Sequence, residues 1–344
     1  MIFGNFITED ARSNNTVFGE KVDIPLGYYE LLREAFACKG VEINTPDLNA
    51  DQEASFDLYI EGQHLTAATR RPRYLIALEN PNHNERNANQ NYCQNFTKVF
   101  TWNLALFEMP NVIKVLPPHQ IAHADFPPYE DRDIFTCMIN ANKNFKKKLP
   151  SDLYGERIST IRWYEKNVPE EFSLFGRGWE KPPPEYALLG KIKRSIPSLR
   201  SKWFGYRCFP SYQGEIVDKG QVLRRSKFSY CYENNHGISN YITEKIIDSF
   251  VYGCIPIYWG AGNVLEFIPE DCFIDRRKFR DTEEVHQFLL GITSTQFAAY
   301  QANIEDFLKS EAAKKFSFEH FVSTVVGEIC KDIGIKVNEA DKRH

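Results

Sequence analysis

A polar loop and a lysine stand at the start of a predicted helix, directly after a predicted strand. The aromatic run Phe228–Tyr232 is typical of a buried strand, and apolar residues then recur at helical spacing as far as Phe250. The first N–H groups of a helix lack intrahelical partners and lie at the positive end of its dipole, so they favour anions, and Lys245 adds a full charge. These residues predict a phosphate site. The alternative is that Glu244 and Lys245 form an ordinary solvated helix face.

A carboxylate follows a second apolar strand. Tyr74–Leu78 is apolar throughout, and Glu79 is the first charge after it, at the carboxyl end where parallel sheets place their sites. Glu79 is therefore a candidate general base, whose pKa partial burial would raise. A loop glutamate that caps the next helix is the alternative. His83 is a weaker candidate, for contact with an acceptor.

The phosphate site needs a strand–loop–helix–strand unit. Ile255–Trp259 predicts the second strand, and the two strands should be parallel with a right-handed crossover. Asn240 can cap the helix and Gly253 can end it in a left-handed conformation. Ligands bind beyond the carboxyl ends of such strands, so Glu233–Asn240 should face the site.

Strands and helices alternate in the rest of the chain, which predicts an α/β protein with doubly wound sheets. In the first half the spacing predicts a helix over Tyr28–Cys38, a helical pattern within Asn87–Leu106, and strands at Val41–Ile43, Phe56–Glu61, Tyr74–Leu78 and Val112–Leu116. In the second half it predicts strands at Ile134–Ile139 and Phe172–Gly176, and helices over Tyr154–Asn167, Asp281–Leu290, Gln296–Leu308 and Phe318–Ile333. Arg157 is expected on the face of its helix opposite Ile158, Ile161 and Tyr164.

Composition narrows the function. The 344 residues are 42% hydrophobic and 26% charged with a net charge of −4, which suits a two-domain globular protein and gives no sign of nucleic-acid binding. Eight cysteines without metal-binding spacing predict reduced, mostly buried thiols and no metal site. No apolar run approaches the roughly 18 residues of a membrane span. These features predict a cytoplasmic protein, peripheral at the inner membrane only through its acceptor, with the oligomeric state left open.

Four blocks in register resemble the donor-site signature of the α1,3/4-fucosyltransferases. In chain order they are Glu233-Asn234, Tyr241–Lys245, Ile255–Gly260, and Phe267–Pro269 with Phe273-Ile274. Leu78–His83 is similar to the family's Glu-Ser-Pro segment, with Asn80 in place of the serine. Asn240 stands where the family usually has an aspartate, and it keeps a short polar side chain there.

The resemblance implies a GT-B glycosyltransferase with two Rossmann-like doubly wound domains. Residues 1–128 would bind the acceptor, residues 129–315 would bind GDP-fucose, and residues 316–344 would supply a helix that packs back across the domains. The resemblance makes Glu79 the general base and assigns the donor to Arg157, Asn234, Asn240, Tyr241, Thr243, Glu244 and Lys245. Arg162 and Arg177 are the alternatives to Arg157 for the diphosphate.

The implied reaction is inverting α1,3-transfer of fucose from GDP-fucose to a hydroxyl of an N-acetylglucosamine-containing glycan of the N-acetyllactosamine or Lewis type. Lys245, Arg157 and the helix end would stabilise the leaving diphosphate, so no obligatory metal is expected. Asp131-Arg132-Asp133 resembles the metal-binding DxD of another transferase fold, but it lies in a linker before a strand. The alternatives are another acceptor, linkage or GDP-sugar, or a non-catalytic nucleotide- or glycan-binding protein.

Overall fold

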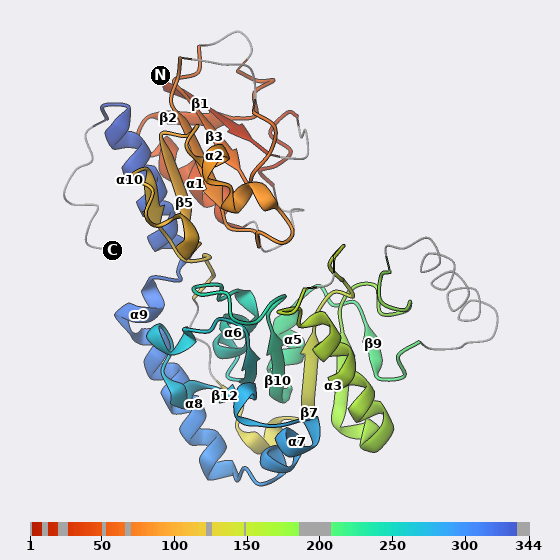
Figure 1. Ribbon diagram of the computed structural model, residues 1–344. Helices are drawn as coiled ribbons and strands as arrows, with labels where there is room; N and C mark the ends of the chain where they lie inside the picture. The colour runs from red at the N-terminus through yellow and green to blue at the C-terminus, as the bar shows by residue number, and fades with distance from the viewer. Residues whose placement is uncertain are drawn as a thin grey trace. The chain divides into compact units, whose positions relative to one another are not determined.

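The computed structural model divides the chain into two compact units, residues 1–120 with 314–344, and residues 121–313 (Figure 1). The structure describes residues 2–8, 13–19, 27–49, 53–65, 70–121, 126–147, 149–185 and 208–335. The eight cysteines are free thiols, and all except Cys38 are buried, as the sequence predicts.

The first unit is built on a parallel sheet of six strands in the order β2-β1-β3-β4-β5-β6. The strands are β1 (Ile2–Ile7), β2 (Val41–Asn44), β3 (Phe56–Ile60), β4 (Arg73–Ala77), β5 (Lys98–Thr101) and β6 (Val112–Lys114). In register, Leu58 of β3 pairs with Tyr74 of β4, so the carboxyl ends of β3 and β4 meet at the same edge of the sheet.

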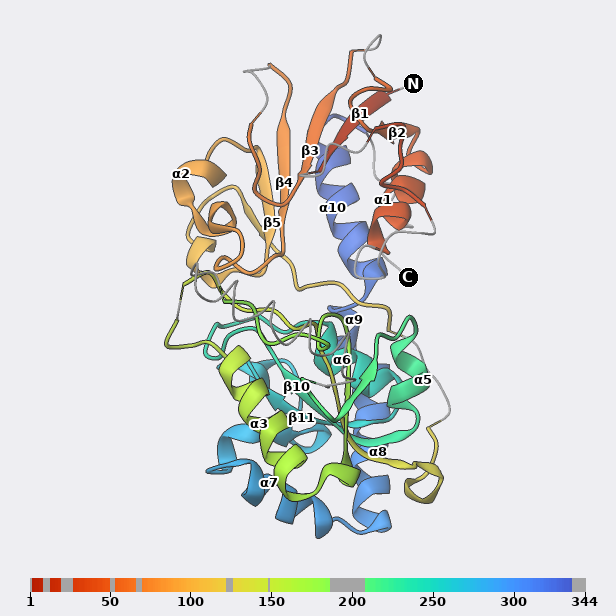
Figure 2. The same cartoon turned by 90° about the vertical axis from the view of Figure 1, so that its right-hand side faces the viewer.

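Helices cover both faces of this sheet (Figure 2). The helices α1 (Tyr28–Ala37) and α10 (Phe318–Asp332) pack on one face, where their apolar residues share a core with β1, β3 and β4. On the other face, α2 (Gln90–Cys93) contributes to a smaller core with Tyr59 and Leu75. Although α10 comes from the end of the chain, the Lys98 ammonium of β5 joins it to the sheet, 2.7 Å from carboxylate oxygens of both Glu328 and Asp332.

The second unit holds another parallel sheet of six strands, in the order β12-β11-β10-β7-β8-β9. Its strands are β7 (Ile134–Ile139), β8 (Phe172–Phe175), β9 (Tyr212–Gly214), β10 (Ser226–Tyr232), β11 (Ile255–Trp259) and β12 (Ile274–Asp275). The predicted strands at 228–232 and 255–259 are therefore central and parallel, with Phe228 opposite Ile255. The predicted α/β class with two doubly wound sheets is confirmed.

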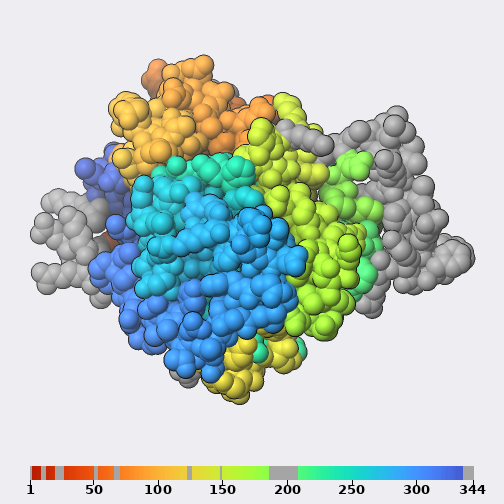
Figure 3. All heavy atoms as spheres, turned by 60° about the horizontal axis from the view of Figure 1, so that its bottom comes forward, coloured from red at the N-terminus to blue at the C-terminus, as the bar shows by residue number. Residues whose placement is uncertain are grey.

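Among its described residues, the second unit has the α-helices α3 (Tyr154–Asn167), α5 (Lys219–Leu223), α6 (Glu244–Val251), α7 (Thr282–Leu290) and α8 (Ser294–Lys309), followed by the short α9 (Glu311–Lys314). Residues of α3 and α7 share one core with the sheet, whereas α5 packs on the other face. Figure 3 shows the atoms of α7 and α8, in blue, beside those of α3, in yellow-green.

Two predictions for the first half are wrong. The helical pattern within Asn87–Leu106 instead forms α2, the strand β5 and two short 3₁₀ turns, Glu85–Ala88 and Leu104–Leu106. Phe96, Val99 and Phe100 are all buried, so these apolar residues correctly indicated a buried segment, but their helical spacing did not indicate its secondary structure. The second error is an omission, because Ile2–Ile7 forms β1 inside the sheet.

Candidate active site

The turn between β10 and α6 places the predicted phosphate-binding residues in one segment of the second unit. The helix begins at Glu244 and Thr243 is its N-cap residue, so the prediction that Asn240 caps it is wrong. Asn240 instead takes a left-handed conformation (φ 64°), its N–H donating to Oδ1 of Asn263 at 2.9 Å. Asparagine tolerates this conformation better than most residues, because its short side chain can hydrogen-bond locally. Gly253 ends the helix at φ 63°, as predicted.

Glu233, at the end of β10, is the centre of this turn and is completely buried. Its carboxylate accepts hydrogen bonds from the Thr243 N–H at 2.8 Å and the Thr243 hydroxyl at 2.7 Å. Burial raises the pKa of Glu233, against the opposing effect of the Lys245 charge. A side chain at Gly260 would come within 2.3 Å of Cγ of Glu233, which explains the glycine after β11.

Lys245 lies over this carboxylate at the first turn of α6. Its Nζ is 3.3 Å from Glu233 Oε2, 2.9 Å from Thr243 Oγ1 and 3.3 Å from Glu244 Oε1. Burial acts to lower the pKa of Lys245, but the charges of Glu244 and Glu233 outweigh it and raise the pKa, so the ammonium stays protonated. The Thr243 side chain makes no capping hydrogen bond to the helix, because its hydroxyl donates to Glu233 instead. A charged ammonium and a helix N-terminus without a side-chain cap together suit an anion.

Arg157 is on the buried face of α3 with Ile161 and Tyr164, so the prediction that it lies on the opposite side is wrong. Its Nη2 donates to the carbonyl oxygens of Tyr232 at 2.7 Å and Glu233 at 2.8 Å, and to Asn234 Oδ1 at 3.1 Å. Burial lowers its pKa. The structure thus brings Arg157 to the end of β10, where it fixes the backbone that carries Glu233.

The remaining donor candidates surround the same turn. Asn234 donates from Nδ2 to the Tyr241 hydroxyl at 3.3 Å, which links the loop to the segment before α6. Tyr241 is buried and Glu244 is half-buried. All seven predicted donor residues therefore contact the end of β10 or the start of α6, or lie in the loop between them.

The alternatives to Arg157 lie on the surface. Arg162 is exposed and pairs with Glu165 at 2.6 Å, and Arg177 is exposed, 3.9 Å from Glu215. In the segment that resembles DxD, Arg132 is buried and donates to four backbone carbonyl groups, including those of Leu223 and Ser226, whereas the exposed Asp133 pairs with Arg225.

Glu79 and His83 lie together in the first unit, on the loop that follows β4. Both are exposed, so the partial burial expected for Glu79 is not found. The Glu79 Oε1 accepts the N–H of Asn80 at 2.7 Å, and the His83 N–H donates to the Asn80 carbonyl at 2.8 Å. This loop is a compact turn beyond the carboxyl end of β4, where the sequence predicted the base.

Sequence reasoning missed Glu61, which follows β3 beside this loop. Its pKa is raised to about 7, chiefly by burial, with a further contribution from the Glu79 charge. The signal was present, because Glu61 is the first charge after the buried strand Phe56–Ile60, the same pattern that identified Glu79. Glu233 was likewise recognised only as part of a motif.

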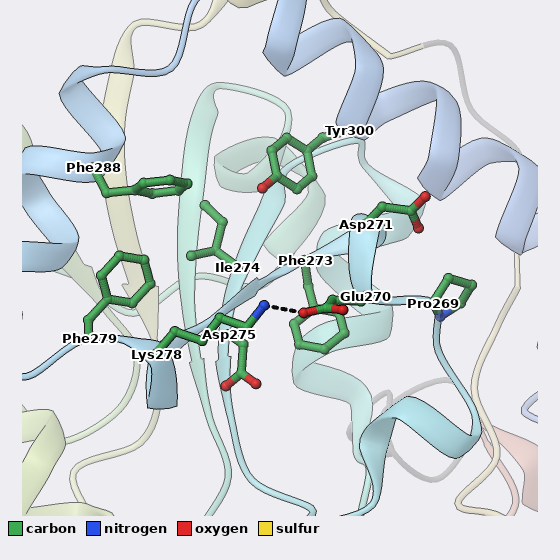
Figure 4. A pocket seen from close by; sticks show the side chains of 10 residues that line it. All are labelled: Pro269, Glu270, Asp271, Phe273, Ile274, Asp275, Lys278, Phe279, Phe288 and Tyr300. Atoms are coloured by element: carbon green, nitrogen blue, oxygen red, sulfur yellow. Dashed lines mark hydrogen bonds and ion pairs between the residues drawn. The ribbon is translucent and has the colours of Figure 1, made fainter.

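A cavity of about 690 Å³ lies along the edge strand β12, between α7 and α8 (Figure 4). Aromatic and acidic residues both line it, with Phe273 beside Glu270, which pairs with Lys278. Its lining residues include Phe279, Phe288 and Tyr300. None of the predicted donor residues lines this cavity, so we place the candidate site at the β10–α6 turn.

Within the described part of the chain, no group of three or more histidine, cysteine or acidic side chains could hold a metal ion. Nor is any helix in those residues long and apolar enough to cross a membrane.

The comparisons with known proteins agree with the sequence blocks. Residues 198–341 match the family model described as glycosyltransferase family 10 (fucosyltransferase), C-terminal part. The predicted fucosyltransferase resemblance is confirmed. An α-(1,3)-fucosyltransferase of Helicobacter pylori is 28% identical over 105 residues, and an α-(1,4)-fucosyltransferase of Arabidopsis thaliana is 35% identical over 120 residues. These matches cover 30% and 33% of this chain but only 22% and 30% of the relatives' lengths.

Solved structures extend the likeness to both units. An α-glucosyltransferase in complex with UDP and a 13-mer DNA aligns with a TM-score of 0.57 at 10% identity, over 96% of this chain and 100% of its own. An α1,3-fucosyltransferase with GDP aligns with a TM-score of 0.52 at 13% identity, over 98% of this chain and 92% of its own. At these identities the likeness concerns the fold alone, which is the GT-B fold.

Proposed function

We propose that this protein is an inverting α1,3-fucosyltransferase that moves fucose from GDP-fucose to a hydroxyl of an N-acetylglucosamine-containing glycan of the N-acetyllactosamine or Lewis type. The observation that carries the proposal is the Lys245 ammonium at the start of α6, held by Glu233 inside a segment that matches the fucosyltransferase model. A buried cation at a helix N-terminus is the electrostatic arrangement that a departing diphosphate needs.

The roles follow from the chemistry of each group. Glu79 takes the proton of the acceptor hydroxyl as that oxygen attacks the anomeric carbon, and His83 on the same loop contacts the acceptor. GDP leaves with the bonding electron pair of the broken C–O bond. Lys245, the first turn of α6 and Arg157 stabilise the negative charge that grows on the diphosphate. Glu244, with the side chains at positions 234, 240, 241 and 243, forms the pocket of the donor.

This division of labour needs no metal, because the protein itself supplies positive charge to the diphosphate. We therefore expect transfer to persist in EDTA. Loss of transfer in EDTA, restored by added Mg²⁺ or Mn²⁺, would show that a metal shares this role. We further propose a cytoplasmic protein that meets membranes only through its acceptor and does not bind nucleic acid.

The direct test is incubation with GDP-fucose and a panel of glycans that includes N-acetyllactosamine, with the product read by mass and linkage. A product one fucose heavier with an α1,3 linkage supports the proposal, and inverted anomeric configuration relative to the donor supports the mechanism. An α1,4 product would correct the linkage. Transfer from GDP-mannose but not GDP-fucose would overturn the choice of donor.

A non-catalytic binding protein is distinguished in the same experiment. Such a protein would be stabilised thermally by GDP but would release no GDP from GDP-fucose with any acceptor. Glu79, Arg157 and Lys245 together argue against this alternative, because a protein that only binds has no physical need to keep all three charges.

A further inference from the structure

Glu61 has a backbone conformation that is unusual for its residue type. It directly follows β3 and lies in the left-handed region at φ 61°. A non-glycine residue is strained in that region, so it persists only where the surroundings hold it. The Glu61 N–H keeps the strand pairing by donating to the Ile76 carbonyl at 2.8 Å. The unusual conformation turns the Glu61 side chain towards the end of the neighbouring strand, β4.

The Glu61 carboxylate binds the backbone of the Glu79 loop. Its Oε2 accepts the Leu78 N–H at 3.1 Å and the Glu79 N–H at 3.0 Å. The same oxygen accepts Nδ2 of Asn87 at 2.5 Å, and this Nδ2 also donates to the Glu79 carbonyl at 2.9 Å. Both backbone polar groups of Glu79 are thus held by side chains from outside its own turn.

Two further contacts fix the same loop. The buried Trp102 donates from Nε1 to the Leu78 carbonyl at 2.7 Å. The Asn87 Oδ1 accepts the Gly62 N–H at 2.8 Å, which ties the residue after Glu61 to the same asparagine. These contacts connect β3, the Glu79 loop and the turn at Asn87, so the loop has one geometry rather than several.

We propose that Glu61 is a positioning residue for fucosyl transfer, which fixes the backbone of Glu79 and so aims its carboxylate. The inference rests on the proposed function, because it assumes that Glu79 is the base. A charge-assisted hydrogen bond that an ionised carboxylate accepts from a backbone N–H group is stronger than a neutral one, so the ionised form of Glu61 holds the loop best. Misplacing a catalytic group by about 1 Å can cost about 10²-fold in rate.

Two titratable groups interact electrostatically with Glu61. Burial is the main cause of the raised pKa of Glu61, and the charge of Glu79 on the loop adds to it. The Glu61 charge in turn adds to the effects of burial and Tyr29 that raise the pKa of Tyr28 in α1. Because the pKa of Glu61 is about 7, its carboxylate gains a proton as the pH falls through neutrality. We therefore expect the turnover of the wild-type protein to fall as the pH is lowered below neutrality and Glu61 becomes protonated.

The test compares Glu61→Gln and Glu61→Gly with Glu85→Gln as the matched control, because Glu85 is an exposed glutamate in the same region. We expect kcat to fall by about 10²-fold in both Glu61 variants, with GDP affinity unchanged. Glycine adopts a positive φ freely, so Glu61→Gly removes the anchor without straining the backbone. If Glu61→Gly keeps wild-type kcat, the proposal is overturned.

Amide hydrogen exchange gives a measurement that does not depend on activity. The amides of Leu78 and Glu79 should exchange faster in both Glu61 variants than in wild type and Glu85→Gln at the same pH. Unchanged exchange at these two amides overturns the anchoring. If wild type and the control transfer no fucose, the proposed function fails by itself, and amide exchange alone decides whether Glu61 anchors the loop.

The pH profile separates positioning from general structural support. Wild type and Glu85→Gln should lose kcat as the pH falls through about 7, the value to which the pKa of Glu61 is raised. Both Glu61 variants should lack this limb, because nothing at position 61 then titrates. An acidic limb near 7 that survives in Glu61→Gln contradicts the proposal.

Discussion

The Glu233 carboxylate lies 3.3 Å from the Lys245 ammonium, with the Glu233 side chain fully buried and the Lys245 side chain 14% exposed. One carboxylate thus orients Thr243, the N-cap of α6, and Lys245 in the first turn of the same helix. Removing either member of such a buried pair leaves the other charge buried without its partner, so the stability of the turn requires that both residues be present or that both be replaced.

Lys245→Ala should weaken GDP binding and turnover together, because it removes the positive charge nearest to the helix start. It also leaves the buried Glu233 without its counter-charge, at a cost of about 3–5 kcal/mol in the free energy of unfolding. Calorimetric titration with GDP measures the first effect and thermal melting the second. Unchanged GDP affinity would remove Lys245 from the diphosphate site.

A double variant separates these two effects. Lys245→Ala with Glu233→Gln removes both charges, so it should recover much of the lost stability, whereas GDP affinity should stay low. Recovery of GDP affinity along with stability would mean that Lys245 serves the fold and not the donor.

Glu79→Gln should abolish transfer while GDP affinity stays near that of wild type. Glutamine keeps the size of the side chain but cannot take the proton of a hydroxyl, and general-base catalysis contributes about 10²–10⁴-fold. Rates of fucose transfer to N-acetyllactosamine measure the effect, with Glu85→Gln as the control. Transfer within a few-fold of wild type would exclude Glu79 as the base.

Glu61 should make stability depend on pH in a direction opposite to that of a salt-bridged carboxylate. Its pKa is raised from 4.5 to about 7, so the folded state binds this proton more tightly than the unfolded state does. The contribution of Glu61 to the free energy of unfolding is therefore greatest below about pH 4.5 and is lost as the pH rises through 7. As the pH rises from 5 to 8, the melting temperature of wild type should therefore fall relative to that of Glu61→Gln. A constant difference would contradict the raised pKa.

The sequence predicted the central elements well because their signals are local. The strand Ile255–Trp259, the helix Tyr154–Asn167 and the end of α6 at Gly253 follow from apolar runs, helical spacing and a residue that tolerates positive φ. The donor residues are grouped along one turn for the same reason, since most of them are neighbours in sequence.

What the sequence did not predict depends on contacts between distant residues. Arg157 is buried because carbonyl groups at the end of β10 accept its hydrogen bonds, so packing overrides the expectation that a charge faces solvent. Similarly, Lys98–Thr101, within the region predicted as helical, forms the strand β5 because β4 and β6 pair with it on either side. The proposed role of Glu61 depends on the hydrogen bonds that it accepts from the N–H groups of Leu78 and Glu79. The pattern of residues along one strand does not reveal such contacts with another strand.

Asn240 offers a test of the turn that is independent of catalysis. At φ 64° a non-glycine, non-asparagine residue is strained, so Asn240→Ala should lower the free energy of unfolding by about 1–3 kcal/mol. It also removes the Oδ1 that accepts Nδ2 of Asn263 at 2.9 Å. Thermal melting with and without GDP measures both the stability and the donor site.

Asn240→Asp and Asn240→Gly divide this effect into its parts. Aspartate, the residue usual at this place in the fucosyltransferases that the chain resembles, keeps the acceptor oxygen and tolerates the left-handed region, so it should be nearly neutral. Glycine avoids the backbone strain but, like alanine, lacks the contact with Asn263. The melting temperature of Asn240→Gly should therefore lie between those of Asn240→Ala and wild type. If alanine melts like wild type, the left-handed turn does not hold the start of α6 in place, and the geometry around Lys245 must depend on Glu233 alone.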